Sequence, residues 1–394
     1  MGANLYVSPQ GDNQNSGLDA DHPLQTISYA CAIILADNLN PRTIYLSEGL
    51  YSPTANSEAF PIHLPDYVSL QGNDELDTIL DAEGSTTVFL LFDCSDVNLN
   101  NLTIINGYDN FYGGGIYSCY SNACLDHVTI ANCHSDNYGG GISSRSSDLK
   151  LINVTITQNS SANVGGGICI SESSTDSLTI INSILWENYP YEIEFFEVYP
   201  SPTLTIAFTD ISGREEGINS YGSNTTVNWL VGNTEIDPLF VDANAGDFSL
   251  SEHSICIDSG IAYFEYEGEI LIDVSENEYY GRTPDLGSHE YFFDKIEIEE
   301  LPPGINKLIA YPNPFNPETN IMFYVEESGL VDLSIYNIKG QRVRKLMAGY
   351  VDAGEHRVVW DGRDENGDKT GSGVFVGRLK FGDRIAIRKM LMLK

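Results

Sequence analysis

Five residues suited to sugar binding precede two glycine triplets in the middle of the chain. Tyr108 and Tyr112 precede the first triplet, and His134, Asp136 and Tyr138 precede the second. The interval between the two triplets also separates Tyr112 from Tyr138 and Tyr108 from His134. Aromatic rings stack on the apolar faces of sugars, and acids and amides hydrogen-bond to hydroxyls. The pattern predicts a glycan-binding ladder. The alternative is that these residues have only a structural role, stacked in the turns of a repeat.

Catalysis on a polysaccharide would need a different set of residues. A lyase needs a base such as arginine or lysine beside Ca²⁺ or basic groups, and a hydrolase needs converging carboxylates. Arg145 is the candidate base, but its column holds Cys119 and Ser171 and no acid. The sequence therefore favours a non-catalytic binding or structural protein over a polysaccharide lyase or glycoside hydrolase. Three carboxylates, or an arginine beside two carboxylates, meeting in one groove would favour the enzyme.

Two acidic and aromatic stretches are candidate metal sites. Glu192 and Glu194 alternate in one stretch, and Glu265 and Glu267 alternate in the other. In a strand, this spacing places carboxylates on one face. Such a row could collect Ca²⁺, the one cofactor that the sequence indicates, and the alternative is a solvated face.

A fixed repeat must position these residues. Gly-Gly-Gly-Ile occurs at 113–116, 139–142 and 165–168, at one constant interval, and a phrase ending in Thr-Ile keeps the same interval. Short runs of β-branched residues between turn residues predict coils of a parallel β-helix, in which each strand pairs with its equivalent one coil on. We expect stacked coils over residues 35–260, with Ile104, Ile130 and Ile156 in one inward column. Asn101 and Asn153 predict an inward amide ladder, interrupted by His127.

Charge divides the chain into two parts. Residues 1–294 hold 42 of the 56 acidic residues and 5 of the 20 basic ones, so the entire net charge of -36 lies there. This excess of acid disfavours nucleic acid as a partner, because phosphates need a basic surface. The sequence contains no apolar run long enough to span a bilayer.

The order of the elements predicts two domains. The pattern of Thr26–Ile34 indicates an amphipathic helix that covers the first coil, and the β-helix with this cap occupies residues 1–294. An acidic, proline-containing linker follows at 295–307. Short alternating strands separated by turns then predict a small Ig-like β-sandwich at 308–394. The predicted fold class is all-β.

Two motifs resemble secreted right-handed β-helix proteins. Tyr6-Val7-Ser8-Pro9-Gln10-Gly11-Asp12, followed by His22-Pro23-Leu24-Gln25-Thr26-Ile27, resembles the N-terminal motif of proteins related to pectate lyases. Asp237-Pro238-Leu239-Phe240 and Asp285-Leu286-Gly287-Ser288-His289 resemble the closing segment of the bacterial choice-of-anchor Q family. The resemblance implies a right-handed helix, an extracellular polysaccharide or surface glycan as partner, and no single chemistry.

The C-terminal part resembles a sorting domain. Tyr311-Pro312-Asn313-Pro314-Phe315-Asn316-Pro317 and the strands after it are similar to the Ig-like C-terminal domains of type IX secretion cargo, which share the hook-capping fold. This resemblance implies the type IX machinery as a partner and an extracellular or outer-membrane surface location. We therefore expect a leader to precede the natural chain.

Cysteine usage leaves the redox state and assembly open. The seven cysteines cannot all pair internally, and no two share a column of the repeat. Buried free thiols are favoured, with one local disulfide as the alternative. Association into a homo-oligomer also stays open.

Overall fold

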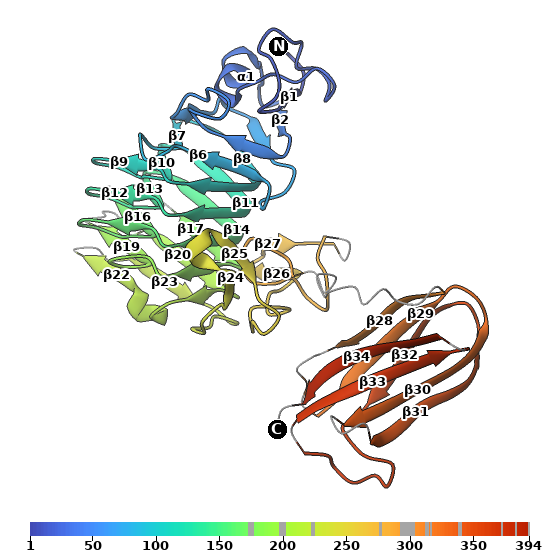
Figure 1. Ribbon diagram of the computed structural model, residues 1–394. Coiled ribbons are helices and arrows are strands. Elements are labelled where there is room, and N and C mark those ends of the chain that lie inside the picture. The colour runs from blue at the N-terminus through green and yellow to red at the C-terminus, as the bar shows by residue number, and fades with distance from the viewer. Residues whose placement is uncertain are drawn as a thin grey trace. The chain divides into compact units, whose positions relative to one another are not determined.

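The computed structural model describes residues 1–171, 177–196, 202–221, 225–275, 278–291, 304–311, 315, 317–337, 341–371, 373–382 and 384–392. The chain forms two compact units, Met1–Phe292 and Phe293–Lys394 (Figure 1). Most of the expected linker, residues 295–303, lies outside the described residues, and the first strand of the second unit already begins at Ile305.

The first unit contains helix α1 (Ile27–Ile33), two short 3-10 helices, η1 (Arg214–Gly217) and η2 (Ala243–Ala245), and the strands β1 (Leu5–Val7), β2 (Arg42–Leu46), β3 (Gly49–Tyr51), β4 (Ile62–His63), β5 (Val68–Gln71), β6 (Thr78–Asp81), β7 (Phe89–Phe92), β8 (Val97–Ile105), β9 (Tyr108–Asp109), β10 (Ile116–Cys119), β11 (Asn122–Ala131), β12 (His134–Ser135), β13 (Ile142–Arg145), β14 (Asp148–Thr157), β15 (Ser160–Ser161), β16 (Ile168–Ser171), β17 (Ser177–Ile181), β18 (Ile184–Trp186), β19 (Ile193–Phe196), β20 (Thr203–Ala207), β21 (Asp210–Ile211), β22 (Ile218–Tyr221), β23 (Thr226–Trp229), β24 (Phe240–Asp242), β25 (Asp247–Leu250), β26 (Tyr263–Tyr266) and β27 (Glu269–Asp273).

The strands of this unit stack as a parallel β-helix. One sheet runs β4-β7-β10-β13-β16-β19-β22, and a larger sheet runs from β1 through β2, β5, β8, β11, β14, β17 and β20 to β23. In the stacked arrows of Figure 1, each coil lies on the one before it. Ile130 pairs with Ile104 on one side and Ile156 on the other, and all three side chains are fully buried. The predicted fold class and the inward isoleucine column are confirmed.

The corner between two faces of each coil explains the Asn101 column. Asn101, His127 and Asn153 all have a left-handed backbone, with φ values of 54°, 51° and 49°. Asparagine adopts this conformation more readily than most residues, because its short polar side chain can bond locally. The predicted amide ladder in this column is wrong, since the column is selected for backbone conformation and Asn153 Nδ2 donates to Asp126 instead, at 3.0 Å.

A buried amide ladder exists in another column. Asn159 Oδ1 accepts from Cys133 N at 3.0 Å, and Asn188 Oδ1 accepts from Asn159 N at 3.0 Å. Each side-chain amide also donates to the carbonyl of an inward isoleucine, Ile130 or Ile156. The ladder satisfies backbone groups inside the coil that would otherwise be buried without a partner.

A helix covers the N-terminal end of the β-helix, and antiparallel hairpins follow its last parallel strand. Thr26 caps α1 by accepting from Tyr29 N, and the helix buries Ile27, Ala30 and Cys31 against the first coils, as expected. Parallel pairing begins at β1 and ends at β23, apart from one isolated bridge from Asp210 to Thr234, so the expected coils at 35–260 begin too late and extend too far. β24–β25 and β26–β27 are antiparallel hairpins, because turns such as Glu267-Gly268 reverse the chain instead of advancing it by one coil.

The closing segment 285–291 lies across the outer side of several coils. Ser288 N donates to Thr155 Oγ1 at 2.9 Å, and the hydroxyls of Ser288 and Thr129 lie 2.6 Å apart. His289 Nδ1 lies 2.6 Å from Glu75 Oε1, and both side chains are almost fully buried. Gly287 has a φ of +94°, and a Cβ there would meet Thr155 Oγ1 at 2.8 Å. The glycine therefore lets the segment pass close to the coils.

The second unit contains the strands β28 (Ile305–Tyr311), β29 (Thr319–Val325), β30 (Gly329–Asn337), β31 (Arg342–Val351), β32 (Gly354–Trp360), β33 (Gly373–Phe381) and β34 (Arg384–Met392). They form the antiparallel sheets β28-β29-β32 and β31-β30-β33-β34. Trp360 is fully buried in the core, with its ring 5.3 Å from Phe315 and 4.9 Å from Phe375. This core belongs to the second unit alone.

Two further expectations can be compared with the described residues. All seven cysteines are free, and six of them are buried, so the favoured interpretation of buried thiols is confirmed and the local disulfide is wrong. Across the described ranges, no helix combines the length and the apolar character needed to cross a membrane.

Candidate functional site

An aromatic strip runs along the outside of the β-helix. It consists of Phe111, Tyr112, Tyr117, Tyr138, Phe196 and Tyr221. Neighbouring ring centroids lie 4.1 Å apart for Tyr112–Tyr117, 4.7 Å for Phe111–Tyr112 and 5.4 Å for Phe111–Tyr138. The strip continues at 5.7 Å from Tyr138 to Phe196 and at 5.5 Å from Phe196 to Tyr221. From β10 to β22 it crosses four coil steps, about 19 Å at 4.8 Å per step.

The glycine triplets position this strip. The loop before each triplet folds over the outer face of the β10–β22 sheet, where a Cβ on Gly139 would meet Ser143 N at 2.9 Å. A Cβ on Gly165 would likewise meet the Cβ atoms of Cys169 and Glu194, each at 3.1 Å. Only glycine permits this approach. The close approach brings the loop aromatics beside the outward rings of the strands.

A polar ladder lies on the same loops and consists of Tyr108, His134, Asp136 and Ser160. The rings of Tyr108 and His134 stack with centroids 6.0 Å apart. Tyr108 Oη donates to Asp136 Oδ2 at 2.8 Å, and His134 Nδ1 lies 2.9 Å from Ser160 Oγ. The hydrogen bond with Asp136 raises the pKa of Tyr108, which keeps the phenol protonated as a donor. Strip and ladder together present apolar faces beside hydroxyl, imidazole and carboxylate groups.

All six predicted ligand-binding residues lie on these loops and the strands next to them. Tyr108, His134 and Asp136 contact one another, whereas Tyr112 and Tyr138 are linked through Phe111. Arg145 lies at the end of β13, with its guanidinium 6.0 Å from the ring of Tyr120. The sequence interpretation missed four members of the aromatic strip, namely Phe111, Tyr117, Phe196 and Tyr221.

The four predicted metal ligands lie in two separate places. Glu192 is buried at the end of the amide ladder, where its carboxylate accepts from Asn188 N and Nδ2. Glu194 is also buried and accepts from Gly165 N at 2.7 Å and from Asn219 Nδ2 at 2.8 Å. Glu265 accepts from Tyr263 Oη, and Glu267 occupies a hairpin turn. In the described part of the chain, no group of three or more metal-ligating side chains could hold an ion.

Two carboxylates, the buried Asp285 and the half-buried Glu290, lie together in the closing segment and not on the strip. Asp285 accepts from Asp258 N at 2.7 Å and from Tyr291 N at 2.6 Å, one bond to each oxygen. Glu290 accepts from Asp285 N at 2.9 Å and from Tyr280 N at 3.1 Å. Burial raises the pKa of Asp285 to about 8. Because both oxygens of Asp285 and of Glu290 accept from backbone amides, the pair holds the loops of the closing segment together.

Glu192 makes the stability of the first unit depend on pH. Burial raises the pKa of this carboxyl to about 7, from an ordinary value of 4.5. A group with a raised pKa in the folded state stabilises the fold at low pH and loses that contribution as pH rises through the folded value. We expect the free energy of unfolding to fall between pH 5 and pH 8, with the Glu192 share on the order of 1–3 kcal/mol.

Glu192→Gln should reduce this fall, which urea unfolding at the two pH values measures. Glu48→Gln is the matched control and should keep the wild-type slope, since Glu48 is exposed. An unchanged slope in Glu192→Gln would show that this carboxyl is ionised in the folded protein. Asp285 contributes in the same direction as Glu192, so part of the slope should remain.

Comparisons with known proteins give two family matches. Residues 317–376 match the FlgD Ig-like domain, within the second unit. Residues 9–236 match a family described as a protein of unknown function, DUF1565, and this range covers the stacked coils. No curated protein matches the chain in sequence.

Solved structures give partial similarities. Pectin methylesterase from carrot is 13% identical over 64% of this chain and 98% of its own, with a TM-score of 0.30. Latent PorU from Porphyromonas gingivalis is 18% identical over 22% of this chain and 9% of its own, with a TM-score of 0.20. PorZ, a type IX secretion component of the same bacterium, is 18% identical over 22% of this chain and 11% of its own, with a TM-score of 0.17.

The chain therefore spans about a tenth of the length of PorU and of PorZ. TM-scores of 0.30 or below do not define a common overall fold. The match to the β-helix family is of a different kind, since it extends over residues 9–236 of the 394. Because that range is more than half of the chain, this protein belongs to the DUF1565 family.

Proposed function

We propose that this protein binds an extended glycan along the aromatic strip without cleaving it. The observation that carries the proposal is the continuity of six rings along the coil axis, beside a polar ladder that can exchange hydrogen bonds with hydroxyls. A step of about 4.8 Å between coils is close to the length of one sugar unit. A polysaccharide chain could therefore lie along the strip with successive units over successive coils.

The solvent exposure of rings in the aromatic strip supports binding of a long ligand. Phe111, inside the ring series, is 47% exposed, and Tyr221, at one end of it, is 59% exposed. A contiguous patch of exposed apolar side chains promotes aggregation. Where a folded protein keeps such a patch, the patch typically marks a binding surface. The acidic charge of residues 1–294 favours a neutral glycan over an anionic one.

We further propose that the second unit attaches the protein to the cell surface after export by a type IX secretion machinery. Support comes from its separate hydrophobic core, its match to an Ig-like domain and its balanced charge, with 14 acidic and 15 basic residues from 295 to 394. A domain with its own core folds independently of the β-helix. The β-helix would then be displayed outside the cell, where extracellular glycans are available.

Changing Tyr112 and Tyr138 together to alanine should abolish glycan binding. Each stacked ring contributes on the order of 1 kcal/mol, and removing both interrupts the strip on either side of Phe111. The change should leave the melting temperature nearly unaltered, because neither side chain belongs to the buried core. Affinity electrophoresis against a panel of neutral and acidic polysaccharides measures the loss.

The matched control removes two exposed tyrosines elsewhere, Tyr29 and Tyr280, which are 40% and 53% exposed. That double variant should bind as the wild type does. Tyr221→Ala offers a test of length, since it shortens the strip at one end and should weaken long oligosaccharides more than short ones. Retention of full binding by the Tyr112 and Tyr138 double variant would place the glycan elsewhere.

A further inference from the structure

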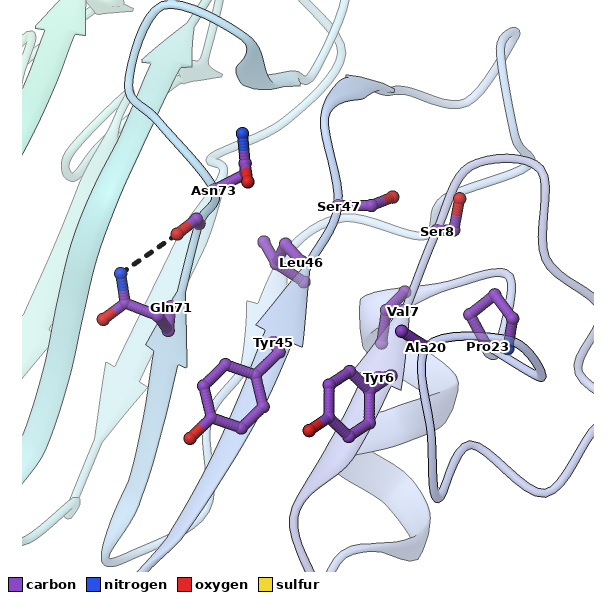
Figure 2. Close-up of a pocket in the computed structure, with 11 residues that line it drawn as sticks. Tyr6, Val7, Ser8, Ala20, Pro23, Tyr45, Leu46, Ser47, Gln71 and Asn73 are labelled. Atoms are coloured by element: carbon purple, nitrogen blue, oxygen red, sulfur yellow. Dashed lines mark hydrogen bonds between the residues drawn. The ribbon is translucent and has the colours of Figure 1, made fainter.

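A groove near the N-terminus lies apart from the aromatic strip. It has a volume of about 420 Å³ and is lined by residues of β1, β2 and β5, the turns after them, and the loop around Ala20 and Pro23. Tyr6, Tyr45 and Gln71 form one row across the three strands, paired in register. Figure 2 shows these side chains next to one another, with Ala20 and Pro23 beyond Tyr6.

The groove is built rigidly. Tyr6 N donates to Gly17 O, and Leu24 N donates to Tyr6 O, each at 2.8 Å, so the loop wall is held to β1. At the other side, a Cβ on Gly72 would meet Asn101 O at 1.8 Å, so the floor follows the backbone of the next coil closely. A pocket that is formed before its ligand arrives binds without a cost of ordering its walls.

The chemistry of the lining points to a neutral, hydroxyl-rich ligand. The rings of Tyr6 and Tyr45 stack with centroids 5.1 Å apart and form an aromatic wall. Within the described residues, no hydrogen bond occupies either phenol hydroxyl, Gln71 Oε1 or Asn73 Oδ1, while Gln71 Nε2 and Asn73 Nδ2 are used internally. Aromatic faces beside hydroxyl and amide groups match the alternating apolar faces and hydroxyls of a sugar.

The charge and the size of the groove restrict the class of ligand further. The lining contains no acidic, basic or histidine side chain. An anionic ligand, such as one with a carboxylate or phosphate group, would therefore find no cation in the groove, and the negative charge of the first unit would repel it. Three strands span two coil steps, about 10 Å, which accommodates two sugar units. The volume falls in the range of small-molecule sites.

We propose that this groove is a second saccharide site, specific for one or two neutral sugar units. It stands independently of the aromatic strip, because its residues come from β1, β2 and β5 and the strip begins after β9. The protein would then hold a long chain along the coils and a short neutral sugar at its N-terminal end.

Calorimetric titration of the full-length protein with cellobiose, maltose, lactose and digalacturonic acid tests the proposal. At least one neutral disaccharide should bind, and digalacturonic acid should bind at least tenfold more weakly. Tyr45→Ala should lower the affinity for the neutral sugar about tenfold, which corresponds to about 1.4 kcal/mol. Ala20→Trp should also lower it, because Ala20 is an exposed wall residue and the larger side chain fills the groove without entering the core.

Two control variants separate binding in the groove from binding on the strip and from the mere loss of a surface tyrosine. Tyr29→Ala removes an exposed tyrosine of α1 outside the groove and should bind as the wild type does. The Tyr112 and Tyr138 double variant should also retain disaccharide binding, whatever its effect on polysaccharides. Failure of all three neutral disaccharides to bind, equal binding of digalacturonic acid, or unchanged affinity in both Tyr45→Ala and Ala20→Trp would overturn the proposal.

Discussion

Ile130→Asp is expected to unfold the β-helix. Ile130 is fully buried between Ile104 and Ile156 in the middle of the coil stack. An aspartate at this position would place a carboxylate among apolar side chains with no cation to pair with it. The cost of several kcal/mol is comparable to the whole stability of a typical domain, about 5–15 kcal/mol.

Circular dichroism and proteolysis measure this effect. The variant should lose the β signal of the first unit and be cut throughout residues 1–291, whereas the second unit should remain resistant because its core is separate. Ile255→Asp introduces the same change at a side chain that is 45% exposed, and it should fold normally. A folded Ile130→Asp protein with wild-type stability would show that the isoleucine column does not contribute to the stability of the core.

Deleting residues 305–394 is expected to abolish surface display in the natural host while leaving the β-helix folded. The deletion removes the strands of the second unit and none of the first. Each unit has its own hydrophobic cluster, so loss of one should not expose the core of the other. The melting temperature of the remaining β-helix should stay within a few degrees of its value in the full chain.

Surface labelling of intact cells measures display, and a reciprocal fusion completes the test. Residues 293–394 joined to an unrelated exported reporter should bring that reporter to the surface. The exposed Tyr350→Ala substitution in the full chain is a control for nonspecific damage, since this side chain is 68% exposed. Display of the truncated protein at wild-type levels would assign sorting to the β-helix or to another segment.

The repeat made the architecture predictable. The constant interval from Gly113 to Gly139 to Gly165 fixes which side chains share a column, so the inward position of Ile130 follows from the sequence once coils are assumed. The helix at 27–33 could also be placed, because Thr26 is a typical capping residue before an apolar run. These features depend on local sequence and on one regular spacing.

The structural roles of the asparagines could not be predicted from the repeat. Asn101 recurs as Asn153 in the register of the glycine triplets, whereas Asn159 is followed in its ladder by Asn188 after a longer interval. One set of asparagines serves a left-handed corner and the other a buried amide ladder. The type of residue is the same in both, and only the direction of the backbone at that position separates the two uses. That direction depends on how the coil bends, which composition does not specify.

The far end of the aromatic strip was missed because the repeat changes length. Cys169 pairs with Ser143 at the interval of the glycine triplets, but the next pairings in the column, to Glu194 and then to Asn219, come after a shorter interval. Phe196 and Tyr221 therefore fall outside the register of the triplets. Their own separation, which equals the shorter interval and has an aromatic ring at both ends, was the signal available in the sequence.

The closing segment would have a mechanical consequence if the second unit anchored the protein as proposed. Ser288 and His289 bond to Thr155, Thr129 and Glu75, so the chain leaves the β-helix beside its middle coils and not from its last strand, β23. Tension applied through the second unit would therefore reach these buried contacts before it reached the coil of β23. The last coil would therefore stay folded for as long as these contacts hold.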